Sequence, residues 1–166
     1  STFKLLVFYT LGGLICLTMF LVWKYPKITP ITNLTTAYNI QSYNRGEHLV
    51  TNVTACTECH SEPNSNFIGG GGRKFSRSKG YPGTIYSSNI TPYNLDKYTD
   101  EELALAITSG IKQNKDIIFP VMPYSYYKYI SKYDLECMII YLRSLPKIES
   151  AMPERELLLP MKMMLR

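Results

Sequence analysis

Residues 56–60 read Cys-Thr-Glu-Cys-His. This C-x-x-C-H pattern is the attachment signature of c-type haem. Two thiols two residues apart on a helical turn can both add to the vinyl groups on one edge of a porphyrin. The following residue, His60, is then held beneath the ring with its imidazole facing the iron. The sequence therefore predicts one covalent haem c, with Cys56 and Cys59 as thioether positions and His60 as an axial iron ligand.

A C-x-x-C pair also occurs in thioredoxin-like dithiols and in structural zinc sites. The dithiol needs a preceding strand within a parallel α/β pattern, which is not evident in this sequence. A zinc site needs four ligands, and the spare candidates Cys137, His48 and Cys16 form no matching pair. We therefore favour haem over both alternatives.

Haem iron takes a sixth ligand unless it binds a substrate. Met122 lies in the stretch Phe-Pro-Val-Met-Pro-Tyr, residues 119–124, between two prolines. Proline fixes φ and removes a backbone donor, so this segment is a stiff loop that can present a thioether to iron. We predict Met122 as the second axial ligand. The alternatives are a buried, gap-filling Met122 and ligation by His48.

Residues 5–23 carry no charge. Nineteen helical residues reach about 28 Å, close to the hydrocarbon thickness of a bilayer. We predict a transmembrane anchor over residues 1–24, with Trp23 at the interface. A cleaved signal peptide is the alternative, but no small-x-small cleavage site follows the apolar run. The polar, proline-containing residues 25–42 are predicted to be a linker.

Helix signals in the remaining sequence predict an all-α domain over residues 43–149. One helix is expected over 41–58, with the haem motif at its end. A capping box begins a second helix at Thr99. A cap at Ser131 begins a third, in which Leu135, Met138, Ile139 and Leu142 recur at helical spacing and which ends before Pro146. Residues 61–92 are rich in Gly, Ser and Asn and are expected to be a long loop that covers a haem face.

Composition sets further limits. The chain has 166 residues, is 45% hydrophobic and has a formal net charge of +5, which suits one ordinary domain and excludes disorder. The charge excess is too small to indicate a nucleic-acid partner. Residues 150–166 form a Met-rich tail that could wrap its own domain, dock on a partner or touch the membrane.

Several segments together carry a family resemblance. They are GEHLVTNVTACTECH (46–60), GGGGRKF (69–75), GTIYSSNITP (83–92), YTDEELALAITSGIK (98–112) and FPVMPYSYYKYISKYDLECMIIYLRSLP (119–146). In this order they resemble single-haem class I cytochrome c domains. The similarity is greatest to the cytochrome subunits of bacterial membrane-bound alcohol, aldehyde and gluconate dehydrogenases. The resemblance covers about residues 43–147.

The resemblance implies a class I cytochrome c fold and one-electron transfer rather than catalysis by this chain. Cys56, Cys59, His60 and Met122 carry over as thioether and axial positions. In the family that the chain resembles, haem is attached outside the cytoplasm. The resemblance therefore implies that residues 24–166 lie in the periplasm, with the anchor in the bacterial inner membrane. The expected partners are subunits of a respiratory complex. A free tethered shuttle, and an enzyme or sensor with an open iron site, are the alternatives.

Three further residues are candidates for the haem pocket. Tyr124 could hydrogen-bond a propionate or line the exposed haem edge, with half-buried packing as the alternative. Arg73 could neutralise propionates, or could be an ordinary solvated cation. Asn89, by the resemblance only, is expected to hold a turn near the haem.

Overall fold

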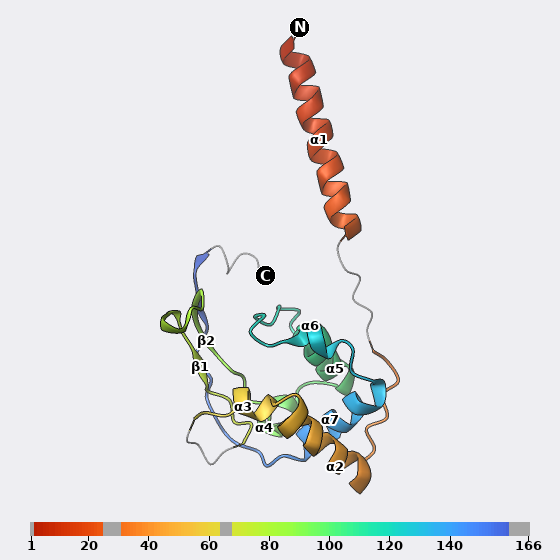
Figure 1. Cartoon of the computed structure of the whole chain (residues 1–166), viewed down its shortest axis with the longest axis vertical. Helices are drawn as coiled ribbons and strands as arrows, with labels where there is room; N and C mark the ends of the chain where they lie inside the picture. Colours follow the sequence, from red (N-terminus) through yellow and green to blue (C-terminus); the bar gives the residue numbers. More distant parts are fainter. Residues whose placement is uncertain (1, 25–30, 64–67, 160–166) are drawn as a thin grey trace.

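The computed structural model describes residues 2–24, 31–63 and 68–159 (Figure 1). Most of the described elements are helices. They are α1 (Thr2–Lys24), α2 (Ile40–His48), the π-helix η1 (Leu49–Val53), α3 (Cys56–His60), the 3₁₀-helix η2 (Arg77–Lys79), α4 (Pro92–Leu95), α5 (Asp100–Ser109), α6 (Tyr124–Tyr127) and α7 (Lys132–Ser144). Three short strands complete the fold: β1 (Lys74–Phe75), β2 (Gly83–Tyr86) and β3 (Glu156–Leu157).

Helix α1 contains one stretch, Thr2–Phe20, that is long and apolar enough to cross a membrane. None of its side chains is buried. A soluble core helix would bury an apolar face, so this exposure is compatible with a membrane anchor. Trp23, predicted at the interface, lies outside the residues whose side chains the structure describes.

The crossing of α2 over α7 forms the centre of the helical core (Figure 1). Gly46 makes the close approach possible, because a Cβ on it would lie 2.0 Å from the carbonyl oxygen of Cys137. Beside this contact, the rings of Tyr43 and Tyr141 pack with centroids 5.4 Å apart. The buried apolar side chains come mainly from four elements. They are Leu49, Val50, Leu95, Leu103, Ala104, Ile107, Leu135, Cys137, Met138, Ile139, Tyr141 and Leu142.

Helix ends follow the signals in the sequence. Thr99 and Glu102 form a reciprocal capping box at the start of α5, and Gly110 ends that helix with φ of 69°. Ser131 caps α7 by accepting a hydrogen bond from the backbone N–H of Asp134. These two predicted helices are confirmed. The expected helix over 41–58 is instead divided into α2, η1 and α3.

The chain is helix-rich, as predicted, but the expectation of an all-α fold is correct only in part. Residues 61–92, expected to be a loop, contain β1 and β2, which pair antiparallel with Phe75 opposite Ile85. Strand β3, from the predicted tail, pairs with the other edge of β2, with Gly83 opposite Leu157. Thr84, Ile85 and Tyr86 are β-branched or aromatic, which favours a strand. Because the strands are short and come from distant segments, no alternating pattern of apolar and polar residues marks the sheet in the sequence.

Residues 31–39, inside the predicted linker, lie against the helical core. Ile31 and Leu34 pack on the buried cluster. The backbone N–H of Thr35 donates to Glu136 Oε1 on α7 at 2.7 Å. Only residues 25–30, which lie outside the described part of the chain, therefore separate α1 from the segment in contact with the domain.

Arg143 on α7 bonds two backbone carbonyls and one carboxylate at the end of α4 and the start of α5. Its guanidinium donates to the carbonyl oxygens of Leu95 at 2.7 Å and Tyr98 at 2.6 Å, and to Asp100 Oδ1 at 2.9 Å. The Arg143 side chain is only a quarter exposed. It therefore holds the start of α5 against the closing helix.

We expect Arg143→Met to lower the free energy of unfolding by about 2 kcal/mol, because two carbonyls and one carboxylate lose a charged donor. Urea denaturation followed by far-UV circular dichroism measures this change. Lys147→Met is the matched control, because it removes an ion pair with Asp96 at an exposed position. Such exposed pairs contribute about 0.5 kcal/mol or less. Equal effects of the two substitutions would contradict the role assigned to Arg143.

Candidate functional site

The motif CTECH lies on the single helical turn α3. Thr54 ends the preceding π-helix, and Ala55 then adopts a left-handed conformation with φ of 49°. This break turns the chain so that α3 begins at Cys56. Because positions three apart on a helix share a face, Cys56 and Cys59 project to the same side of the turn.

The two cysteines differ in their surroundings. Cys56 is half-buried and packs against the apolar core, whereas Cys59 is exposed. Burial raises the pKa of the Cys56 thiol, although a hydrogen-bond contact with Thr54 Oγ1 at 3.1 Å acts in the opposite direction. The folded chain therefore disfavours the thiolate of Cys56.

His60 is oriented by the loop that follows β2. Its Nδ1 lies 2.7 Å from the carbonyl oxygen of Ser88. A carbonyl can only accept, so Nδ1 carries the proton and Nε2 keeps the lone pair. Burial lowers the pKa of His60, opposed by this hydrogen bond, and so favours the neutral ring. A neutral imidazole with Nδ1 held by a carbonyl is the form that binds a metal through Nε2.

The glycine run at residues 69–72 bonds the backbone of both His60 and the loop after β2. The N–H of Gly71 donates to the His60 carbonyl at 2.7 Å, and the N–H of Gly72 donates to the Ser87 carbonyl at 3.0 Å. Gly71 has φ of 77°, and a Cβ there would lie 2.6 Å from the backbone nitrogen of Asn89. Position 71 therefore requires glycine, because the glycine run passes close to the backbone of Ser88 and Asn89 there.

Asn89 joins these loops to the C-terminal segment. Its side chain is 1% exposed and donates to the Ile148 carbonyl at 2.7 Å and to Ser150 Oγ at 2.8 Å. Its Oδ1 accepts from the backbone N–H and the hydroxyl of Thr91. The structure thus places Asn89 in a turn one residue after Ser88, where it fixes the carbonyl that accepts from His60.

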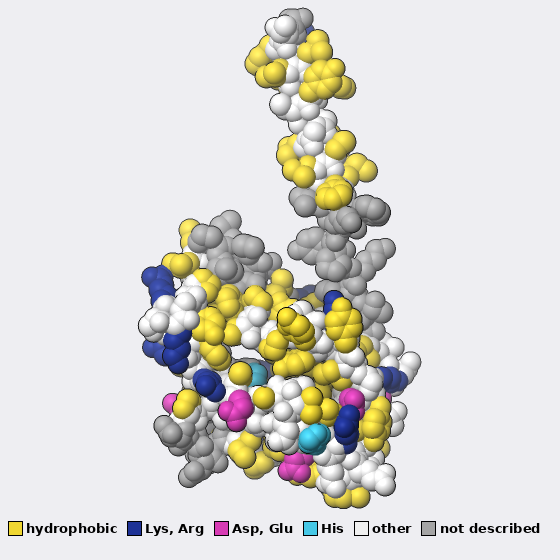
Figure 2. All heavy atoms as spheres, viewed as in Figure 1, with side chains coloured by type: hydrophobic (Ala, Val, Ile, Leu, Met, Phe, Trp, Pro, Cys, Tyr) yellow, Lys and Arg dark blue, Asp and Glu magenta, His cyan; other side chains and the backbone are white. Residues whose placement is uncertain are grey.

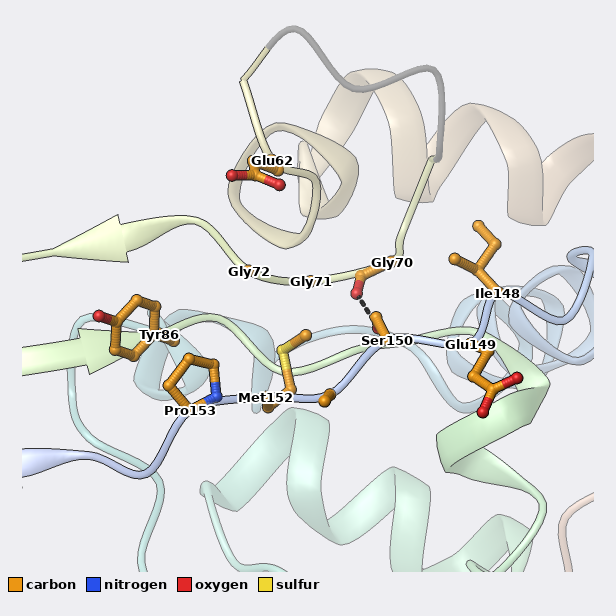
Figure 3. A pocket seen from close by; sticks show the side chains of 11 residues that line it. Glu62, Gly70, Gly71, Gly72, Tyr86, Ile148, Glu149, Ser150, Met152 and Pro153 are labelled. Atoms are coloured by element: carbon orange, nitrogen blue, oxygen red, sulfur yellow. Dashed lines mark hydrogen bonds between the residues drawn. The ribbon is translucent and has the colours of Figure 1, made fainter.

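A pocket of about 300 Å³ lies at this junction (Figure 3). Figure 3 shows the glycine run on one side and residues 148–153 on the other, joined by the hydrogen bond from Ser150 Oγ to the Gly70 carbonyl at 2.6 Å. Arg155 then donates to the Ile117 carbonyl at 3.3 Å. The Leu158 N–H donates to the Pro82 carbonyl, so the tail contacts its own domain as far as Leu158. Met161, Met163 and Met164 lie outside the described residues.

Met122 lies in a turn that leads into α6. Its backbone N–H donates to the Phe119 carbonyl at 3.2 Å, and the Tyr124 N–H donates to the Met122 carbonyl at 2.9 Å. The Met122 side chain is half-buried. Five residues later, the Tyr127 hydroxyl donates to the carbonyl of Thr54 at 3.1 Å. This bond ties the Met122 segment to the residue two positions before Cys56.

The sequence pattern does not distinguish Tyr127 from the tyrosines around it, but its hydroxyl bonds the residue two positions before Cys56. Tyr124 instead packs over Gly110, where a Cβ would lie 2.6 Å from its ring. Arg73 donates from its guanidinium to the Glu58 carbonyl within α3. Of the three further candidates, Arg73 and Asn89 therefore support the motif and its flanking loop, whereas Tyr124 packs against Gly110. His48, the rival ligand, is exposed, with Nδ1 3.4 Å from Asn52 Nδ2.

Burial of Tyr127, with smaller contributions from Cys56 and Cys59, raises its pKa to about 12. The unfolded tyrosine ionises near 10, so folding favours the neutral phenol. We expect a stabilising contribution that is complete below pH 10 and is lost as pH rises towards 12. Urea midpoints measured between pH 8 and 12 should fall more steeply in the wild type than in Tyr127→Phe. Parallel curves would contradict this assignment, and Tyr126→Phe, at an exposed position, is the control.

Within the described part of the chain, no group of three or more His, Cys, Asp and Glu side chains is placed to hold a metal ion. Figure 2 shows a hollow on one face of the molecule, edged by hydrophobic side chains, with a histidine side chain recessed in it. The ring of Tyr127 and the half-buried Cys56 belong to the same partly buried apolar set. The residues present therefore suit a flat apolar group with a liganded metal better than a bare cation.

No family model matches the chain. It is similar to the cytochrome c subunit of a quinone-dependent alcohol dehydrogenase from Gluconacetobacter polyoxogenes. The two are 33% identical over 89 residues, 52% of this chain and 18% of that protein. A gluconate 2-dehydrogenase cytochrome c subunit from Pantoea cypripedii is 33% identical over 105 residues, 58% of this chain and 22% of its own length. The resemblance predicted from the sequence is confirmed.

A third relative extends the similarity along the chain. A fructose dehydrogenase cytochrome subunit from Gluconobacter japonicus is 28% identical over 123 residues, 72% of this chain and 24% of that protein. The chain thus spans about a fifth to a quarter of the length of these relatives. All three names describe a cytochrome subunit of a dehydrogenase, and the first two specify cytochrome c.

Proposed function

We propose that this chain carries one covalently bound haem c and transfers single electrons as a subunit of a membrane-bound respiratory complex. The single observation that carries the proposal is the arrangement of the motif. Cys56 and Cys59 share one face of α3, and His60 Nδ1 donates to the Ser88 carbonyl, which leaves Nε2 available for iron. The similarity to cytochrome c subunits of alcohol, gluconate and fructose dehydrogenases supports it.

The proposed haem domain comprises residues 43–149 in a class I cytochrome c fold. Cys56 and Cys59 would hold the haem covalently, and His60 and Met122 would be the axial ligands. The haem supplies a centre that accepts and releases one electron, and a Met/His ligand pair raises its potential and saturates the iron. The chain's own residues supply the rest. Ser88 fixes the tautomer of His60, and the Tyr127–Thr54 bond holds the Met122 turn beside the motif.

We propose that residues 1–24 anchor the chain in the bacterial inner membrane and that the haem domain lies in the periplasm. The apolar stretch Thr2–Phe20 and the relatives' membrane-bound class, as the resemblance implies it, support this location. Two alternatives remain as competing proposals. A free tethered shuttle would purify alone after mild detergent extraction, whereas a complex subunit would copurify with its partners. An open iron site would bind carbon monoxide in the ferrous form.

The deciding experiment is an absorption spectrum of the purified, matured protein in the oxidised and reduced states. A c-type spectrum with the weak near-red sulfur-to-iron band supports a Met-ligated electron carrier. A c-type spectrum without that band removes Met122 as a ligand and favours the open-site alternative. Matured protein without any covalent haem would overturn the proposal.

A further inference from the structure

The hairpin formed by β1, η2 and β2 carries a group of cations. From residue 63 to residue 95 the sequence contains Arg73, Lys74, Arg77 and Lys79 but no Asp or Glu. Arg73 is bound to the Glu58 carbonyl. Lys74, Arg77 and Lys79 are exposed, and none of them takes part in an ion pair among the described residues. Figure 2 shows Lys and Arg side chains gathered along this edge of the molecule.

Two exposed leucines end the segment of β3, which pairs with the edge of β2 opposite β1, and the exposed Glu154 and Glu156 precede them on that segment. Strand β3 runs along β2, and the backbone N–H of Leu158 donates to the Pro82 carbonyl near the hairpin tip at 3.3 Å. Leu158 and Leu159 are 44% and 72% exposed. Gly83 permits this close pairing, because a Cβ there would lie 2.2 Å from the Glu156 carbonyl oxygen. The hairpin and the end of the neighbouring strand therefore combine cations that form no ion pair among the described residues with exposed apolar side chains. We call Lys74, Arg77, Lys79, Leu158 and Leu159 the hairpin patch.

We propose that the hairpin patch docks on an anionic lipid surface. Cations beside apolar side chains are the combination that binds membrane interfaces, because the cations meet anionic headgroups while the apolar groups enter the boundary region. The inference rests on the anchor in the proposed function but not on its haem chemistry. An acidic protein is the competing occupant, and it would have no need of the two leucines.

The length of the tether favours lipid as the occupant. Six residues, 25–30, separate α1 from Ile31, which packs against the core. A chain of that length spans at most about 25 Å. The domain of an anchored chain therefore always lies next to the bilayer. Which of its surfaces faces the lipid then depends on how strongly each surface binds the lipid headgroups. Each cation near an anionic leaflet contributes about a fivefold preference for the docked state.

The test uses the full haem-loaded chain in nanodiscs of neutral phosphatidylcholine, with or without phosphatidylglycerol. Hydrogen–deuterium exchange is measured at residues 74–81 and 156–159. We expect slower exchange in the anionic discs, lost at high salt and lost in Lys74→Gln/Arg77→Gln/Lys79→Gln. The matched control is Lys97→Gln/Lys115→Gln/Lys128→Gln, which removes three exposed lysines outside the hairpin and should retain the protection. The haem spectrum should be the same in all variants.

Equal exchange in neutral and anionic discs would overturn the proposal, as would equal loss of protection in the control variant. Protection by soluble polyglutamate but not by anionic discs would reassign the patch to an acidic protein. A chain that does not enter discs contradicts the anchor. In that case the same measurement with added phosphatidylglycerol vesicles still decides whether the patch binds anionic lipid.

Discussion

Met122→Ala is expected to leave the haem attached but to open its iron. The proposed thioether bonds to Cys56 and Cys59 would not depend on the sixth ligand, so covalent retention should be unchanged. Loss of the thioether should remove the near-red band and let carbon monoxide bind the ferrous form. The reduction potential should fall by on the order of 100 mV, since axial ligands set haem potentials over a range of about 0.8 V. Absorption spectra and a redox titration measure these changes.

Met152→Leu is the matched control, because it removes a half-buried thioether elsewhere in the domain. Met152 lies at the glycine run, with its sulfur 2.9 Å from the position of a Cβ on Gly71. That substitution should leave the band and the potential unchanged. An intact band in Met122→Ala would exclude Met122 as a ligand, and loss of the band in Met152→Leu would point to Met152 instead.

Gly46→Ala is expected to lower the free energy of unfolding by about 3 kcal/mol or more. The new Cβ would lie 2.0 Å from the Cys137 carbonyl oxygen and 2.9 Å from Tyr141 Cβ. The first is a backbone atom of α7 and the second is bonded directly to that backbone, so neither can rotate out of the way. Helices α2 and α7 must therefore move apart. Overpacking of this kind costs about 1–3 kcal/mol and sometimes more. Urea unfolding followed by circular dichroism measures the loss.

Asn44→Ala tests the same helix at an exposed position. It should change stability by only about 0.5 kcal/mol, the usual range for surface sites. If Gly46→Ala unfolds at the same urea concentration as Asn44→Ala, the helices do not cross as closely as the structure has them.

Local signals predicted the parts of the fold that depend on local chemistry. The capping box at Thr99, the cap at Ser131 and the apolar spacing of α7 lie within a few residues of sequence, and the structure has all of them. The division of the helix expected over 41–58 was not predicted. No proline or glycine marks the π-helix η1 or the left-handed Ala55 that divide it. The β-sheet was missed because its strands come from distant segments.

The candidate site divides in the same way. CTECH is contiguous, so its chemistry could be predicted directly. The partners that orient it come from elsewhere: Ser88 by its backbone carbonyl, Thr54 likewise, and Asn89 through contacts with residues 148–150. A backbone carbonyl can belong to any residue type, so no side-chain pattern identifies it. Tyr127 was one of four nearby tyrosines, and only the fold distinguishes it from the others.

The half-burial of Cys56 bears on when a haem could be attached. In the folded domain this thiol packs against the core and its raised pKa disfavours the reactive thiolate. The buried cluster that it packs against includes side chains of α7, which follows the motif in the chain, and Gly46 cannot meet Cys137 until α7 has been synthesised. Before α2 closes onto α7, Cys56 therefore lacks part of the core that half-buries it in the folded domain. If the motif carries haem as proposed, we expect the chain that has not yet closed α2 onto α7 to accept it more readily than the folded domain does.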